Sequence, residues 1–335
     1  MIVEGFLKSV KKLVETEAKV GVTAYEIVHE DWLFKLVHFK DKKKKKLKYP
    51  VLIVYAYINR PYVMDLFDEV SIIRKELDAN LDVWMVDWGY PKPADKYLRI
   101  EDYIDYIDFC VEYIKEAKKV DKISLHGYCL GGDLAIIYSA LHPENVKNLV
   151  IQALPIDFHT SNTLALWARK IDPEKITKTI GNASGDLLNF AFLIVDPIRL
   201  VLAKYQGLLE NLDNEKFVEN FIRMDKWIFD SPSIPAETFK EYITEWYHEN
   251  KLIKNEYVIK GEKVNLRNIN MPVLVLVAER DHISPPESVK PFLNMISSKD
   301  KLLLSVNKGH IGLSTSRGAK EMWDKAIAWI VERSK

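Results

Sequence analysis

The stretch ISLHGYCLGGDLAIIYSAL, residues 123–141, decides the fold. Its first part, ISLH, is a short apolar run typical of a buried strand, and its last part, DLAIIYSAL, predicts a helix. Between them lies a tight turn of the form G-x-S-x-G, with Cys129 in place of the serine. Gly127 and Gly131 are needed there because a Cβ at either position would collide with the adjoining backbone. Gly132 further allows close packing of the helix on the sheet.

Short apolar runs alternate with helical segments along much of the chain. The predicted strands cover residues 32–39, 51–57, 83–87, 123–126, 149–153, 273–278 and 302–306. Runs such as VLIVYAY and VLVLVA are apolar at nearly every position, as strands covered on both faces must be. From Ile100 to Ile114, apolar residues recur at three- and four-residue steps, which predicts a helix with Cys110 as a small buried hydrophobe. The alternation predicts an α/β fold with a mainly parallel sheet.

The alternation stops after Pro155 and resumes at Met271. The chain between them is helical in pattern, rich in Trp, Phe and Tyr, and without a clear buried strand. We therefore predict one sheet domain, residues 1–155 and 269–335, interrupted by a helical insertion, residues 156–268.

Composition and charge exclude several classes of function. The 48 basic residues cancel the 48 acidic ones, so no net field favours nucleic acid as a partner. The two cysteines, Cys110 and Cys129, make neither a disulfide framework nor a zinc-type spacing, which suits a reducing compartment. Residues 1–20 lack the apolar core of a secretory signal, and residues 189–202 are too short and polar for a membrane span. We expect a cytoplasmic protein with no transmembrane segment and no metal.

Cys129 is the predicted nucleophile. The amino end of the following helix offers positive partial charge and free N–H groups, which favour a thiolate. The Leu130 backbone N–H supplies one donor for an oxyanion hole. The second donor is expected in the loop after the strand predicted from residue 51, near Tyr57, Ile58 and Asn59, and Ile58 is our choice. The alternative is a buried cysteine in a glycine-rich turn without chemical function.

A carboxylate and a histidine follow two later strands. Asp281 comes after the strand at 273–278, and His310 comes after the strand at 302–306, so both lie at the carboxyl edge of the predicted sheet. The chain order nucleophile, acid, histidine agrees with this assignment. Glu279 is the alternative acid, but Asp281 lies further past the strand end. His282 is expected to shape the turn, and Asp87 precedes the cysteine in the chain, against the usual order.

Cysteine at this turn favours acyl transfer over hydrolysis. An acyl group moved from a thioester to Cys129 becomes another thioester and keeps its driving force for transfer to an alcohol or amine. Water competes with the acceptor for the acyl group on Cys129. We therefore interpret the aromatic-rich insertion as a lid over the turn that excludes water and admits an apolar acyl chain. The alternative is an ordinary helical subdomain without a gating role.

At these residues the sequence resembles the poly(3-hydroxyalkanoate) synthases, most closely the catalytic subunit of the class III, two-subunit enzymes. The family's box G-x-C-x-G-G is met by residues 127–132. The similarity covers about residues 55–312 and includes YAYINRPYVMDL (55–66), VDWGYP (86–91), PIDFHT (155–160), NFAFLIVDPIRL (189–200), MDKWIFDSP (224–232), MPVLVLVAERDHISPP (271–286) and GHIG (309–312). The similarity is specific because it includes the insertion as well as the catalytic loops.

The resemblance implies the α/β-hydrolase fold with a helical cap and a Cys-Asp-His triad, which falls by position on Cys129, Asp281 and His310. It implies a polymerase of (R)-3-hydroxyacyl-CoA, with short chains such as 3-hydroxybutyryl-CoA, in which the CoA thioester is substrate and no separate cofactor is needed. His310 would take the proton of Cys129, the thiolate would attack the thioester, and a substrate hydroxyl would then attack the bound acyl group. Asp281 either orients His310 or assists that hydroxyl.

The resemblance also implies partners. Class III catalytic subunits generally need a second synthase subunit, so we expect a homodimer or hetero-oligomer associated with polymer granules. Tyr128 and Leu130 differ from the residues most often found in the class III box, and Asn307 and Lys308 replace a smaller pair before the histidine. Two other functions compete: an esterase or thioesterase with the same triad, and a catalytically silent scaffold that binds granules or a partner.

Overall fold

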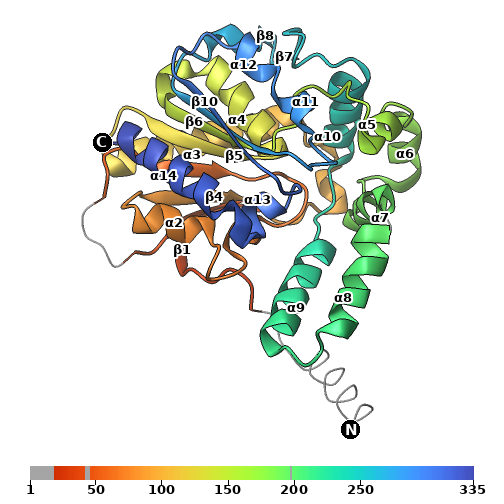
Figure 1. Ribbon diagram of the computed structural model, residues 1–335. Helices are drawn as coiled ribbons and strands as arrows, with labels where there is room; N and C mark the ends of the chain where they lie inside the picture. Colours follow the sequence, from red (N-terminus) through yellow and green to blue (C-terminus); the bar gives the residue numbers. More distant parts are fainter. Residues whose placement is uncertain (1–18, 42–45, 197) are drawn as a thin grey trace.

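A mostly parallel sheet forms the centre of the molecule (Figure 1). The computed structural model describes residues 19–41, 46–196 and 198–335, and within these ranges eight strands form the sheet in the order β1-β2-β4-β3-β5-β6-β9-β10. Their bounds are β1 Tyr25–Glu30, β2 Lys35–Phe39, β3 Val51–Val54, β4 Val83–Asp87, β5 Ile123–Tyr128, β6 Val146–Gln152, β9 Val273–Ala278 and β10 Lys301–Val306. β1 and β2 pair antiparallel, as do β2 and β4, while β4 through β10 pair in parallel.

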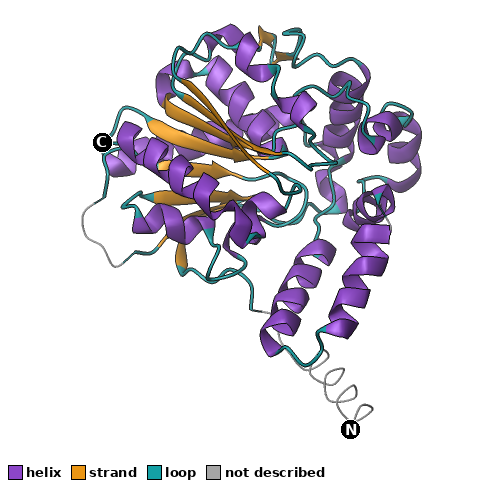
Figure 2. Ribbon diagram, viewed as in Figure 1, coloured by secondary structure: helices purple, strands orange, loops and turns teal. Residues whose placement is uncertain are grey.

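Helices cover both faces of this sheet (Figure 2). The helices α2 (Ile72–Asp78) and α14 (Lys320–Arg333) lie on one face, and α3 (Ile100–Lys118) and α4 (Leu130–Leu141) lie on the other. Every residue of β3, β5 and β9 is buried, which agrees with their nearly continuous apolar sequence. Short 3₁₀ turns and helices connect these elements: η1 Pro61–Asp65, η2 Pro93–Tyr97, η3 Pro143–Asn145, α11 Pro286–Val289, α12 Phe292–Met295, α13 Gly312–Thr315 and η7 Arg317–Ala319.

The predicted mainly parallel sheet is confirmed, with differences at the strand ends. The bounds of β4 and β9 are as predicted, whereas β2 begins three residues later and β3 ends three residues earlier than expected. β1 was not predicted; it is an edge strand whose residues are all exposed or half-buried. Cys110 lies fully buried on α3, as predicted, and burial raises the pKa of its thiol.

A helical segment, residues 156–268, connects β6 to β9, and these two strands are neighbours in the sheet. Its helices are α5 Thr163–Ala168, α6 Pro173–Ile180, α7 Gly185–Val195, α8 Lys204–Glu210, α9 Glu215–Phe229 and α10 Ala236–Glu241, with π-helical turns η4 Ile198–Ala203 and η5 Tyr242–His248 and the 3₁₀ turn η6 Leu266–Asn268. A small hairpin, β7 Val258–Ile259 and β8 Glu262–Lys263, was not predicted. In Figure 1, α8 and α9 run side by side and extend away from the sheet.

The end of α9 is fixed to the segments that follow β3 and β4. Asp230 accepts hydrogen bonds from the Tyr62 hydroxyl at 2.7 Å and from the Tyr90 hydroxyl at 2.5 Å. The Trp227 indole N–H donates to the Arg60 carbonyl oxygen at 2.7 Å. The helical segment is therefore held by directed hydrogen bonds as well as by apolar packing.

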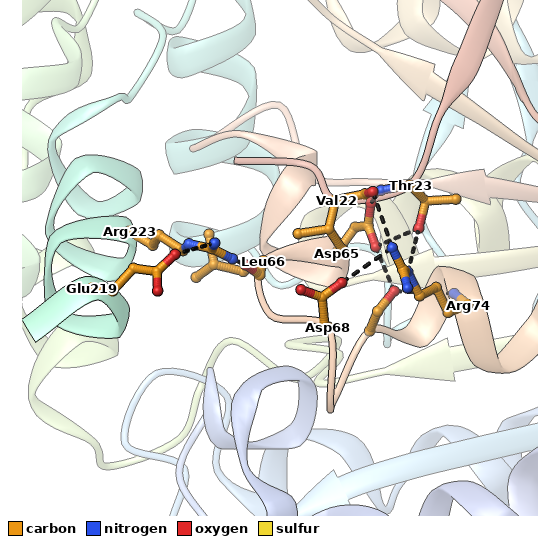
Figure 3. A network of polar contacts seen from close by, with 9 residues as sticks. Val22, Thr23, Asp65, Leu66, Asp68, Arg74, Glu219 and Arg223 are labelled. Atoms are coloured by element: carbon orange, nitrogen blue, oxygen red, sulfur yellow. Dashed lines mark hydrogen bonds and ion pairs between the residues drawn. The ribbon is translucent and has the colours of Figure 1, made fainter. Parts of the chain in front are cut away.

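A second polar network anchors η1 (Figure 3). The buried carboxylate of Asp65 accepts hydrogen bonds from the Thr23 backbone N–H at 2.7 Å, the Thr23 hydroxyl at 2.9 Å and the Ser71 hydroxyl at 2.5 Å. Arg223 of α9 donates to the Leu66 carbonyl oxygen at 3.1 Å. The chain before β1 and the helix α9 are thus tied to the same short segment.

Asp82, just before β4, carries a buried ion-pair cluster. Its carboxylate lies 2.7 Å from His38 Nε2 and 2.8 Å from Lys118 Nζ. Burial alone would raise its pKa, but hydrogen bonds from these two partners outweigh burial and lower the pKa of Asp82 to about 2. The cluster ties β2, β4 and α3 together.

Part of the predictions lies outside the described residues. The absence of a secretory signal was predicted for residues 1–20, of which residues 1–18 are not described. Within the described ranges, every helix is too short or too polar to cross a membrane.

Candidate active site

The turn at Cys129 has the strained geometry that its sequence predicts. Cys129 lies between β5 and α4 with φ 53° and ψ −128°, a backbone conformation that residues with a side chain rarely adopt. A Cβ at Gly127 would lie 2.6 Å from the Gly132 Cα, and a Cβ at Gly131 would lie 2.1 Å from the Val54 carbonyl oxygen. Only glycine fits at positions 127 and 131, and the thiol is left half-buried at the tip of the turn.

Asp281 and His310 meet at the carboxyl edge of the sheet. Asp281 follows β9 and His310 follows β10, and His310 Nδ1 lies 2.7 Å from Asp281 Oδ2. The other oxygen of Asp281 accepts two backbone N–H groups of its own loop, each at 2.9 Å. The alternative acid, Glu279, is exposed and accepts a hydrogen bond from Ser305 at 2.7 Å. The structure therefore brings Asp281, and not Glu279, to the histidine.

The other two residues considered from sequence lie differently. The Asp87 carboxylate pairs with the Arg60 guanidinium at 2.6 Å. His282 lines the same cavity as the cysteine, and its backbone oxygen accepts a hydrogen bond from Asn162 at 3.0 Å. His282 thus takes part in fixing the turn after β9, as its position suggested.

The environment of His310 stabilises its protonated form. Burial by itself would lower the pKa of the imidazole, but the negative charges of Asp281 and of a Cys129 thiolate outweigh burial and hold the pKa well above its usual range. The Tyr128 ring packs 5.7 Å from the imidazole ring, centre to centre. These neighbours therefore stabilise the imidazolium that forms when His310 takes up a proton.

A cavity of about 340 Å³ opens beside the cysteine. Its wall includes Cys129, His310, Leu130, Ile58, Phe192 and Ile228. The first four come from the sheet domain and the last two come from α7 and α9 of the helical segment. The wall is largely apolar, so the cavity suits an acyl chain better than a charged ligand.

Several cavity residues were not found from the sequence. Asn189, Tyr242 and Tyr247 also line the cavity, and the two tyrosine hydroxyls lie 3.3 Å apart. They come from two distant parts of the chain, and no local spacing relates them to Cys129. No sequence signal short of the fold itself would have brought them together. Asn59, which the sequence placed beside Ile58 in the loop after β3, lines the cavity too.

Asp133, one turn into α4, was also missed. It is fully buried, and its two carboxyl oxygens have no hydrogen-bond partner among the described residues. Burial, followed by the nearby charge of Cys129, raises the pKa of Asp133 well above its usual range. Burial thus favours the neutral form of this carboxyl beneath the turn. Within the described ranges, no cluster of three or more His, Cys, Asp or Glu residues is placed to hold a metal ion.

Two family models match the sequence. The model described as alpha/beta hydrolase fold matches residues 49–316, which is most of the chain. The model described as Poly-beta-hydroxybutyrate polymerase (PhaC) N-terminus matches residues 8–75.

Several curated relatives share one name. The poly(3-hydroxyalkanoate) polymerase subunit PhaC of Allochromatium vinosum is 42% identical over 287 residues, covering 85% of this chain and 81% of that protein. The subunit PhaC of a Synechocystis strain is 37% identical, covering 98% of this chain and 89% of that protein. The subunit PhaC of Haloferax mediterranei is 38% identical, and the match covers 95% of this chain but only 66% of that longer protein.

Solved structures bear on the fold alone. A monoglyceride lipase from Saccharomyces cerevisiae superimposes with a TM-score of 0.59 at 14% identity, covering 96% of this chain and 99% of that one. A monoacylglycerol lipase from Paleococcus ferrophilus gives a TM-score of 0.55 at 18% identity, covering 86% and 98%. The predicted α/β-hydrolase fold is confirmed. The chain belongs to the family of poly(3-hydroxyalkanoate) polymerase subunits PhaC, which are acyltransferases built on the α/β-hydrolase fold.

Proposed function

We propose that the protein polymerises (R)-3-hydroxyacyl-CoA with short acyl chains, such as 3-hydroxybutyryl-CoA, into polyester and releases CoA. Family membership supports the reaction. The observation that carries the assignment of residues is the shared cavity: Cys129 and His310 both line it, and Asp281 holds the histidine from behind at 2.7 Å. The triad is therefore Cys129, His310 and Asp281.

The first step transfers the acyl group to the enzyme. Because His310 Nδ1 faces Asp281, the other ring nitrogen, Nε2, is the one that takes the proton from Cys129 Sγ. The thiolate attacks the thioester carbonyl, the bond to the CoA sulfur breaks, and CoA leaves with the proton that His310 returns. The product of this step is an acyl-cysteine thioester.

The second step forms the ester bond. The hydroxyl of a hydroxyacyl unit attacks the Cys129-bound acyl carbon, its proton passes to His310, and the Cys129 thiolate leaves. Asp281 supports both steps because its charge stabilises the imidazolium. In this scheme Asp281 acts by orienting His310, and direct assistance to the hydroxyl is the alternative.

Two backbone N–H groups, those of Leu130 and Ile58, are proposed to stabilise the oxyanion. Leu130 is the first residue of α4, where N–H groups have no partner within the helix. Ile58 lies on the loop after β3, and both residues line the cavity. The close approach of Gly131 to the end of β3 keeps these two segments adjacent.

The helical segment, residues 156–268, is proposed to act as a cap. Its support is that Phe192 and Ile228, from two of its helices, complete the wall of the cavity that contains Cys129. Apolar side chains at this place exclude water from the acyl-cysteine, and water is the nucleophile that would end the polymer.

The proposed setting follows the family resemblance. We propose that the protein works in the cytoplasm at the polymer-granule surface, as a homodimer or as a hetero-oligomer with a second synthase subunit. The CoA thioester is the substrate, no separate cofactor takes part, and nucleic acid is not a partner. The balanced charge of the chain supports the last point.

The deciding experiment incubates purified protein with 3-hydroxybutyryl-CoA, with and without a candidate second subunit, and follows both CoA release and polymer turbidity. CoA and turbidity are expected to rise together, and Cys129→Ala is expected to abolish both. Cys110→Ala is the matched control, because Cys110 is buried on α3, and it should retain both. CoA release without polymer would favour the thioesterase alternative, and release by Cys129→Ala at the normal rate would overturn the mechanism.

A further inference from the structure

A partly buried polar bridge joins the loop after β3 to the helical segment in the wall of the cavity. The Ser231 hydroxyl oxygen lies 2.7 Å from Asn59 Oδ1 and 2.8 Å from Asn189 Oδ1. Asn59 follows Ile58 on the loop after β3, Asn189 lies on α7, and Ser231 follows α9. Asn59 and Asn189 both line the cavity. The bridge therefore places the Asn189 amide within two hydrogen-bond lengths of the loop proposed to hold an oxyanion donor.

The bridge leaves Asn189 with an unused polar atom. A hydroxyl has one proton, so Ser231 can donate to only one of the two amide oxygens, and an amide that turns presents its nitrogen instead. In either orientation, one side of the Asn189 amide faces away from Ser231. As the side chain is placed, its Nδ2 has no hydrogen-bond partner among the described residues, and Asn189 is only 5% exposed. Leaving such a group unpaired is unfavourable, because it has lost its hydrogen bonds to water without gaining a partner.

The surroundings of this amide are apolar. Phe192 and Leu193 follow it on α7, Ile228 lies on α9, and all three line the same cavity. An amide that can donate or accept, set in an apolar wall, is the arrangement by which binding sites fix the orientation of a ligand. The ligand group that fits must itself be polar, small and able to reach a buried position.

We propose that Asn189 binds the 3-hydroxyl of the acyl unit in the cavity and so makes the enzyme prefer 3-hydroxyacyl thioesters to plain acyl thioesters. This inference rests on the proposed function. The thioester carbonyl is directed to the oxyanion N–H groups, which leaves the 3-hydroxyl, two carbons away, as the remaining polar group of the acyl unit. A hydroxyl can donate as well as accept, so it matches either orientation of the amide.

The preference has a predictable size. An acyl group without the hydroxyl would bury the amide unpaired, and one neutral hydrogen bond of this kind is worth roughly 10- to 100-fold in rate of acylation. The effect falls on the acylation step, because it depends on the acyl unit that reaches Cys129.

The test compares single-turnover CoA release from 3-hydroxybutyryl-CoA and from butyryl-CoA in the wild type and in Asn189→Leu. The wild type is expected to prefer the hydroxylated substrate by roughly 10- to 100-fold. In Asn189→Leu the preference should collapse toward equality, through slower release from 3-hydroxybutyryl-CoA. Asn189→Ala serves as a second variant that adds no bulk. If either variant folds and keeps the wild-type preference, the inference is wrong.

A matched control is available on the same segment. Asn182 also joins the helical segment to the sheet domain, since its amide nitrogen donates to the Lys92 carbonyl oxygen at 2.9 Å, but it does not line the cavity. Asn182→Leu should keep the preference, and loss of the preference in Asn182→Leu as well would assign the effect to cap placement and overturn the inference. Failure of the wild type to release CoA from either thioester would instead defeat the proposed function.

Discussion

Replacing Gly131 by alanine tests the packing that shapes the turn at Cys129. The new Cβ would lie 2.1 Å from the Val54 carbonyl oxygen and 2.5 Å from the Tyr55 carbonyl carbon. Both atoms belong to backbone at the end of β3, in the middle of the sheet, so neither can swing aside as a side chain would. Relief requires the start of α4 or the end of β3 to move by more than about 1 Å, given an ordinary contact distance of ~3.5 Å.

The expected cost is at the upper end of the range for overpacking, ~3 kcal/mol. An unfolding entropy of ~2.1 cal/mol/K per residue converts this cost, for a chain of this length, to a fall of ~4 °C in the melting temperature. The same displacement separates Cys129 from the loop that carries Ile58. A shift of ~1 Å between reacting groups costs about 100-fold in rate, so CoA release should fall by about that factor.

The assay is thermal unfolding together with CoA release from 3-hydroxybutyryl-CoA, with Gly132→Ala as the control. A Cβ at Gly132 would meet the end of the Leu154 side chain at 3.2 Å and that of Ile151 at 3.4 Å, which can yield. Alanine also gains up to ~1 kcal/mol of helix propensity there. Gly132→Ala should therefore melt near the wild-type temperature and stay active. A Gly131→Ala protein with wild-type stability and full activity would refute the reasoning.

Three further predictions concern titrating groups. Asp281→Asn should lower the pKa of His310, because the charge of Asp281 raises that pKa. The same variant should slow CoA release at least ~100-fold. A histidine NMR titration in which the pKa of His310 does not move would contradict this. Iodoacetamide should label Cys129 and spare Cys110, because Cys110 is buried and burial raises the pKa of its thiol. Peptide mass mapping shows which cysteine is labelled. Label on Cys110 in the folded protein would contradict the packing of α3. Asp82→Asn should cost about 2 kcal/mol at neutral pH, since the pKa of Asp82 is held at about 2 in the folded chain. That loss should shrink as pH falls from ~4 toward ~2. If urea unfolding shows the same difference in unfolding free energy between the wild type and Asp82→Asn at every pH in this range, the explanation is wrong.

The fold was predictable where burial is strong. β4 and β9 have the predicted bounds because both are apolar runs closed by polar residues. β1 was missed because its residues are exposed or half-buried, so its sequence lacks the continuous apolar run of a buried strand. The β7–β8 hairpin turns through Lys260 and Gly261, both with positive φ, and each strand has two residues, too few for a periodic signal.

Some residues of the candidate site could be predicted from the sequence and others could not. Three of them each follow a strand, and parallel strands place their carboxyl ends at one edge of the sheet: Cys129, Asp281 and His310. Asn189 could not be predicted, because what places it at the cavity is its contact with Ser231 in the folded chain. Such contacts depend on how the helices settle, and no local spacing in the chain encodes that.

The position of the helical segment has a consequence for diversification. The segment departs after β6 and returns at β9, and these strands run parallel with Leu149 opposite Val273. Because the two strands run parallel, the segment leaves at the carboxyl edge of the sheet and returns at its amino edge, between two strands that pair directly. Exchanging this segment for one from a relative should therefore re-size the cavity beside Cys129, while the strands that precede Cys129, Asp281 and His310 keep their places. Under the proposed function, substrate range and chemistry can then evolve as separate modules.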